Sequence, residues 1–131
     1  LINDTNVIKL CDFGVSLDIG CEAAVTRCGT VNYMAPEVAK CPLKRAPEDF
    51  KDRQDLRYGC AVDIWSLGVV TYELLTGMTP TTLAGRHFPG FPKCLSTEAV
   101  DFMCACLNRD PALRPKCGQL LQSAWLQIMG D

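Results

Sequence analysis

Residues 61–76 read AVDIWSLGVVTYELLT, and this stretch decides the fold because it predicts a long helix at the centre of the protein. Apolar side chains recur nearly all the way round the helical path: Val62, Ile64, Trp65, Leu67, Val69, Val70, Tyr72, Leu74 and Leu75. A helix that is apolar on every side has to be buried. Gly77 follows directly, where helices commonly end with a residue in the left-handed conformation. We therefore expect a buried central helix at residues 61–76.

Two further helices are predicted on the C-terminal side, within residues 97–126. Residues 97–107 carry a helical apolar repeat that begins at Ala99, and Ser96 is the candidate N-cap. After the turn NRDPALRP, residues 116–126 predict a third helix with its apolar side chains facing inward: Leu120, Leu121, Trp125 and Leu126. The expected fold class is therefore mainly α, with three main helices.

Composition indicates an ordinary globular domain or part of one. The 131 residues are 48% hydrophobic, and 13 basic residues against 15 acidic residues leave the chain close to neutral. This balance gives no electrostatic argument for a nucleic-acid or membrane partner. The apolar run around residues 62–70 is interrupted and too short to span a bilayer. We expect an intracellular, cytoplasmic protein of unspecified oligomeric state.

The nine cysteines are odd in number, irregularly spaced and without a CxxC pair. This pattern indicates neither a zinc site nor a disulfide framework. Most of these cysteines are expected to be small buried hydrophobes, as is usual in reducing compartments. Cys28 is the one we single out for a test of oxidation.

The N-terminal stretch has a different pattern from the helical part. Residues 7–11 form a short apolar and β-branched run that leads into Asp12, so we expect short strands before and after Asp12. Residues 15–27 follow neither a helical nor an alternating period. Such a stretch is typical of a loop whose order depends on a modification or a ligand.

Five motifs resemble, in content and order, the large lobe of eukaryotic Ser/Thr protein kinases. They are IKLCDFGVS (8–16), GTVNYMAPEV (29–38), DIWSLGVVTYELLTG (63–77), LSTEAVDFMCACLNRDPALRP (95–115) and LLQSAWL (120–126). Any one of these strings is weak evidence for the family, but five of them in the family's order are strong evidence. The resemblance implies a partial protein kinase domain over residues 1–131, from a family whose full catalytic domain is α+β. Residues 12–37 would be its activation segment.

The resemblance implies roles for the three residues that open this segment. Asp12 would bind the Mg²⁺ that bridges the ATP phosphates, and the plain alternative is a solvated turn aspartate. Phe13 would pack against a regulatory helix, and Gly14 would permit the backbone change between active and inactive forms. ATP and Mg²⁺ are thus the implied cofactors of the full-length parent protein.

Two threonines of the segment are candidate functional residues on the same basis. Thr26 stands four residues before Thr30, where similar kinases often carry an activating phosphate, and its alternative is an exposed loop hydroxyl. Thr30 would hydrogen-bond the catalytic aspartate, and its alternative is a turn hydroxyl bonded to its own backbone. The form of GTVNYMAPE implies a Ser or Thr hydroxyl as acceptor.

Three charged residues are expected to have structural roles. Glu37 and Arg114 resemble the buried ion pair that ties the end of the activation segment to the late helices. Asp63 resembles the residue that holds the backbone of the catalytic loop. A helix-start aspartate favoured by the macrodipole is the competing interpretation of Asp63, and both can hold together.

Two stretches depart from the family pattern. Between Glu37 and Asp63 lie 25 residues, where relatives usually need far fewer, and the charged part at 40–59 reads as a surface insert. The insert is either a solvated loop or a docking loop for a substrate or regulator. The stretch at 77–92, by contrast, is too short and too rich in Pro and Gly to form the helix that relatives usually have there. We expect His87, which lies in this loop, to be a surface residue.

Our leading hypothesis is a Ser/Thr protein kinase that transfers the γ-phosphoryl group of ATP to protein hydroxyls. Its partners would be a protein substrate and an upstream activating kinase. The Gly-rich loop, the strand lysine and the catalytic loop are not found in these 131 residues, so we expect the isolated chain to be inactive. The alternative is a non-catalytic, pseudokinase-like or truncated binding module.

Overall fold

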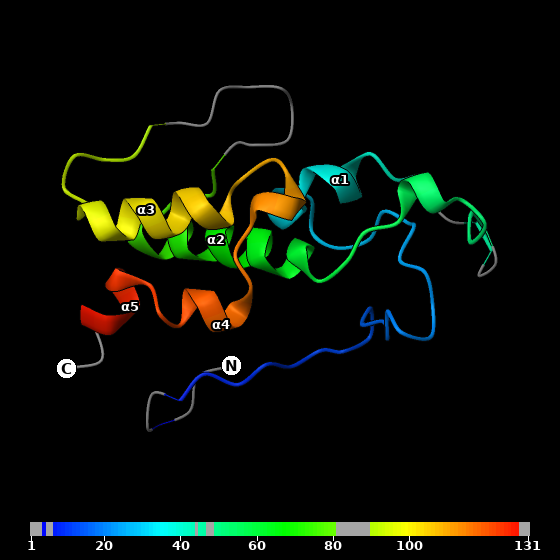
Figure 1. The fold of residues 1–131 in the computed structure, drawn as a ribbon, viewed down its shortest axis with the longest axis horizontal. Coiled ribbons are helices and arrows are strands. Elements are labelled where there is room, and N and C mark those ends of the chain that lie inside the picture. The colour runs from blue at the N-terminus through cyan, green and yellow to red at the C-terminus, as the bar shows by residue number, and fades with distance from the viewer. Residues whose placement is uncertain (1–3, 5–6, 44, 47–48, 81–89, 129–131) are drawn as a thin grey trace.

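The computed structural model describes residues 4, 7–43, 45–46, 49–80 and 90–128. The longest helix, α2 (Ala61–Thr76), lies alongside α3 (Thr97–Cys106), and two short helices, α4 (Cys117–Leu120) and α5 (Ala124–Ile128), complete this bundle (Figure 1). A short α1 (Pro36–Ala39) and three 3-10 turns, η1 (Val31–Tyr33), η2 (Gln54–Leu56) and η3 (Pro111–Leu113), connect the rest. The expected mainly α class is confirmed. His87 and most of the 77–92 loop lie outside the described residues.

Helix α2 spans the 16 residues expected from the sequence and ends at Gly77, whose φ is 75°. The backbone N–H of Gly77 donates to the carbonyl of Glu73 at 2.8 Å, which satisfies one of the free carbonyls at the helix end. The expectation that α2 is buried all the way round is wrong. Leu74 is 79% exposed, and Leu67 and Val70 are also exposed, because no described element covers that face.

The main apolar core joins α2 to α3 and α4. It consists of Ile64, Tyr72, Ala99, Phe102, Met103, Cys106 and Leu120. Helix α3 begins as expected, since the Ser96 hydroxyl accepts from the backbone N–H of Ala99 at 3.2 Å. Phe102 also packs on Trp125 of α5, with ring centroids 4.9 Å apart.

The expected third helix at 116–126 is broken in two. Leu121 is 62% exposed instead of facing inward. The backbone N–H of Ser123 turns back to the carbonyl of Leu120 at 2.9 Å, and a new helical turn begins when the N–H of Gln127 donates to Ser123. The side-chain amide of Gln127 donates to the Leu121 carbonyl at 2.8 Å and so satisfies a group that the break leaves free.

A second core cluster attaches α1 to α2. It consists of Met34, Ala35, Val38, Trp65 and Val69. Pro36 occupies the first turn of α1, where its missing N–H costs nothing. The stretch from residue 29 to residue 38 is therefore fixed on the first half of α2 by apolar packing.

The expected strands around Asp12 do not form a ladder in the described residues, which contain only single-residue bridges such as Ala24 with Tyr58. Short strands need a sheet of several neighbours to be stable, and the described part of the chain offers none there. Figure 1 shows this N-terminal stretch as an extended trace outside the helices.

The cysteines also differ from expectation, because seven of the nine are exposed and only Cys41 and Cys106 are buried. All nine are free thiols. The described residues contain no cluster of three or more His, Cys, Asp or Glu side chains that could hold a metal ion. In the same residues, no helix combines the length and the apolar character that crossing a bilayer requires.

Candidate functional site

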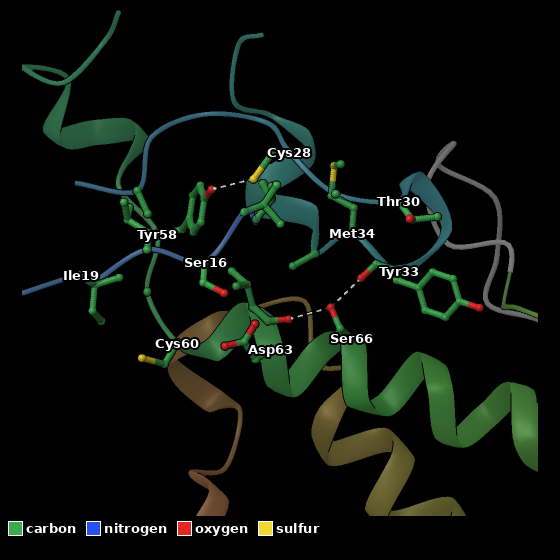
Figure 2. Close-up of a pocket in the computed structure, with 18 residues that line it drawn as sticks. Ser16, Ile19, Cys28, Thr30, Tyr33, Met34, Tyr58, Cys60, Asp63 and Ser66 are labelled. Atoms are coloured by element: carbon green, nitrogen blue, oxygen red, sulfur yellow. Dashed lines mark hydrogen bonds between the residues drawn. The ribbon is translucent and has the colours of Figure 1, made fainter. Parts of the chain in front are cut away.

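A cavity of about 420 Å³ lies between the N-terminal stretch and the start of α2 (Figure 2). The residues that line the cavity come from three parts of the chain: Val15, Ser16, Leu17 and Ile19; residues 28–30 and 33–35; and Val62, Asp63 and Ser66 of α2. Tyr58, Gly59 and Cys60 close the end next to the 40–59 insert. The cavity therefore brings together three parts of the sequence that the motifs had singled out.

The stretch at 29–38 is held beside this cavity by hydrogen bonds to α2. The Ser66 hydroxyl donates to the Tyr33 carbonyl at 2.9 Å and is also 3.2 Å from the Val62 carbonyl (Figure 2). The Tyr33 hydroxyl donates to the carboxylate of Glu73, two turns further along α2. This hydrogen bond raises the pKa of Tyr33, since it stabilises the protonated phenol and a phenolate would face the negative charge of Glu73.

Thr30 and Asp63 both line the cavity and are both exposed. Thr30 is the N-cap residue of η1, but its hydroxyl makes no capping hydrogen bond there. The interpretation of Thr30 as a hydroxyl that caps its own turn is therefore not supported. Asp63 lies in the first turn of α2, so the helix-start interpretation of Asp63 applies.

Asp12 lies outside the lining of this cavity and is exposed. Its φ of 63° is in the left-handed region, which a residue other than glycine adopts at an energetic cost. One carboxylate oxygen accepts weakly from the backbone N–H of Gly14, at 3.4 Å. Phe13 is 67% exposed, so the structure buries none of the three residues in the DFG triad.

The chemistry of Asp12 fits one ligand of a Mg²⁺ ion. An exposed carboxylate is a hard oxygen donor, and Mg²⁺ in nucleotide sites is commonly held by one or two carboxylates together with phosphate oxygens and water. In the described residues, Asp12 does not belong to a group of three or more side chains that could hold a metal ion.

Glu37 and Arg114 form a bidentate ion pair, with N–O distances of 2.6 and 2.8 Å. The Arg114 side chain is fully buried, whereas that of Glu37 is 21% exposed. The guanidinium also donates to the carbonyls of Ala61 and Asn108, both at 2.8 Å, and lies 5.1 Å from the centre of the Trp65 ring. Arg114 thus connects α1, the first turn of α2 and the turn before η3.

Thr26 lies in a half-buried position next to the 40–59 insert. Its backbone carbonyl accepts from the hydroxyl of Tyr58 at 2.8 Å. The same hydroxyl is 3.7 Å from the sulfur of Cys28 (Figure 2). The environment of Thr26 is therefore partly set by a residue from outside the 12–37 segment.

Sequence reasoning did not single out Tyr58, Ser66 or Glu73 as site residues. Ser66 and Glu73 fall on the polar positions of α2, so their spacing along the helix was an available signal once the 29–38 stretch was expected to pack there. Tyr58 carries no local signal, because its contacts reach 32 residues back along the chain.

The chain belongs to the protein kinase family. The model of the protein kinase domain matches residues 1–126. The class agrees with the mainly helical fold and with the packing of Ala35, the first residue of the APE triad at 35–37, against Trp65 and Val69 of α2.

Curated relatives are similar over nearly all of this chain. Protein kinase wis1 of Schizosaccharomyces pombe is 32% identical over 139 residues, which cover 96% of the chain and 22% of wis1. Mitogen-activated protein kinase kinase kinase 5 of Arabidopsis thaliana is 33% identical over 97% of the chain and 18% of that relative. Human mitogen-activated protein kinase kinase kinase 4 is 33% identical over 99% of the chain and 8% of that relative. The chain therefore spans about a fifth or less of the length of these relatives.

Proposed function

We propose that this chain is the activation segment and helical subdomain of an ATP-dependent Ser/Thr protein kinase. The observation that carries the proposal is that two interactions hold the 29–38 stretch beside the cavity. The Glu37–Arg114 ion pair holds it near its C-terminal end, and the Ser66–Tyr33 hydrogen bond holds its middle. A substrate-positioning segment has to be rigid, because small misplacement of a reacting group is costly in rate. Family membership supports the same assignment.

In this kinase, each candidate site residue would have a distinct role. Asp12 would ligate Mg²⁺, which when bound neutralises charge on the transferring phosphoryl group. Thr30, exposed at the cavity, would position the catalytic aspartate, while Asp63 would hold the loop that carries it. Phe13 and Gly14 would govern the position of Asp12. The substrate would be a Ser or Thr hydroxyl of a protein inside the cell.

Thr26 is the proposed site of an activating phosphate, added by an upstream kinase. A phosphothreonine carries about −1.5 to −2 charges at neutral pH and would need a cationic partner. Phosphate mapping on the active full-length protein tests this assignment. Activity that is undiminished in Thr26→Ala would exclude it.

The experiment that tests the function uses the full-length protein with Mg-ATP and peptides that carry Ser, Thr or Tyr acceptors. We expect transfer to Ser and Thr, and a fall in kcat of at least about a hundredfold in Asp12→Asn, because a metal ion supplies several kcal/mol of charge stabilisation. Asp101→Asn is the matched control, since Asp101 is an exposed aspartate on α3. The isolated 131 residues should not transfer phosphate.

Absence of transfer by the wild-type full-length protein to every acceptor would contradict the proposal. The alternative, a non-catalytic binding module, would then stand. Equal loss of activity in Asp12→Asn and Asp101→Asn would argue against a metal role for Asp12.

A further inference from the structure

Described residues near both ends of the 40–59 insert contact the 12–37 segment. Two backbone hydrogen bonds join them: the N–H of Arg27 donates to the carbonyl of Pro42 at 3.0 Å, and the N–H of Tyr58 donates to the carbonyl of Ala24 at 2.9 Å. These bonds lie near opposite ends of the insert. The stretch at 24–27 is therefore held from both sides.

Tyr58 contacts the segment through both its backbone and its side chain. Besides its backbone bond to Ala24, its hydroxyl donates to the carbonyl of Thr26 at 2.8 Å. Ala24 and Val25 are buried at this contact, with 5% and 1% exposed. Burial of Tyr58 and its contact with Cys28 raise the pKa of its phenol, so the hydroxyl remains a donor at every physiological pH.

Two charged side chains of the insert extend the contact toward residues 19–22. Arg57 donates to the Ile19 carbonyl at 3.1 Å, and the Lys51 ammonium lies 3.4 Å from the carboxylate of Glu22. Arg53, by contrast, forms a bidentate pair with Asp55 inside the insert itself. Arg57 and Lys51 thus contact the segment, whereas Arg53 and Asp55 contact each other.

We propose that the 40–59 insert is an intramolecular clamp that keeps residues 19–27 ordered before Thr26 is phosphorylated. Segments of this kind are commonly disordered until a phosphate pairs with arginine. Here the main-chain groups of residues 19, 24, 26 and 27 already have partners, and none of those bonds involves the Thr26 side chain. The proposal concerns the regulation of the proposed kinase site and rests on that function, although the clamp itself can be measured without ATP.

Hydrogen exchange on the full-length protein, read by mass spectrometry, tests the clamp. The reporters are the peptides that contain the Arg27 and Tyr58 amides, and peptides from α2 report global opening. In Arg57→Gln and in Tyr58→Phe we expect exchange at Arg27 to become about fivefold faster for each bond lost, with α2 unchanged. Arg53→Gln is the matched control and should leave the Arg27 amide at the wild-type rate.

The clamp would be overturned if the Arg27 amide exchanged at the wild-type rate in all three variants. It would also be overturned if Arg53→Gln accelerated this exchange as much as Arg57→Gln and Tyr58→Phe do. If Tyr58→Phe or Arg57→Gln also accelerates α2, phosphatase-treated wild-type protein decides the question. Protection of Arg27 that survives removal of the phosphate supports the clamp, and protection that disappears overturns it. Loss of phosphotransfer activity alone would count against the proposed function and not against the clamp.

Discussion

Gly68 of α2 lies so close to Cys106 of α3 that a Cβ atom at Gly68 would be 2.7 Å from the Cβ of Cys106. The same atom would be 2.9 Å from Cγ of Leu107. A glycine in the middle of a helix normally costs stability relative to alanine. At this position it allows the two longest helices to pack against each other, and the main core depends on that packing.

Gly68→Ala should therefore destabilise the protein, although alanine has the higher helix propensity. We expect a loss of about 1–2 kcal/mol in the free energy of unfolding, because overpacking outweighs the gain from alanine. Urea denaturation of the full-length protein measures it. Gly118→Ala in α4 is the matched control, since nothing lies within 4 Å of its added Cβ, and it should be neutral or slightly stabilising. Stabilisation by Gly68→Ala would contradict the packing described here.

Glu37→Gln should cost about 3 kcal/mol of stability. The substitution leaves the buried guanidinium of Arg114 without its counter-charge, and losses at such pairs are about 3–5 kcal/mol, with partial exposure of Glu37 favouring the low end. Thermal denaturation of the variant and the wild type measures this change in stability. The exposed Arg53–Asp55 pair is the control, because solvent screens that pair and Asp55→Asn should change the stability much less. Similar losses at both pairs would show that burial does not matter here.

The two buried thiols should resist modification in the folded protein. Burial raises the pKa of Cys41, and raises that of Cys106 to about 11, so both remain neutral and poorly nucleophilic. Iodoacetamide at neutral pH should label Cys117 rapidly, and Cys106 only after unfolding. Labelling of Cys106 at the rate of Cys117 in native protein would be inconsistent with its burial.

The same burial sets a pH dependence of stability. The folded protein favours the neutral thiol of Cys106, so this contribution is complete below the ordinary thiol pKa of 9.0 and is lost as the pH rises through about 11. Unfolding at pH 8 and pH 11 should show a smaller decrease in stability for Cys106→Ala than for the wild type. A parallel decrease would assign the loss to other groups.

Ser96→Ala should lower stability by about 1 kcal/mol through loss of the helix cap on the Ala99 N–H. The expected local sign is faster hydrogen exchange in the first turn of α3. Ser96→Asn keeps a capping acceptor and should retain most of the stability. If alanine and asparagine behave alike, the cap contributes little.

The long helices were predictable because their signals are local. Periodicity, the cap at Ser96 and the stop at Gly77 placed α2 at its observed bounds and α3 within one residue. The resemblance to protein kinases also implied that Glu37 and Arg114 would meet, although 77 residues separate them. Apolar periodicity failed at residues 116–126, because it does not report the turn at Ser123 that divides the helix.

The remaining parts depend on contacts that no local pattern carries. The insert at 40–59 read as charged and solvated, yet Pro42, Arg57 and Tyr58 bind backbone groups that any residue possesses. The exposed face of α2 was expected to be buried because composition alone does not say which neighbours are present. Burial of the cysteines was misjudged for the same reason.

Arg114 has a consequence for how the chain is made. Its guanidinium is the common partner of Glu37, Ala61 and Asn108, and the ribosome adds it 77 residues after Glu37. Until it emerges, Glu37 of α1 has no counter-ion, and the carbonyls of Ala61 and Asn108 lack the side-chain hydrogen bonds that Arg114 donates to them. Synthesis stalled before this arginine would leave a nascent chain with an unfastened segment, a natural substrate for chaperones and proteases.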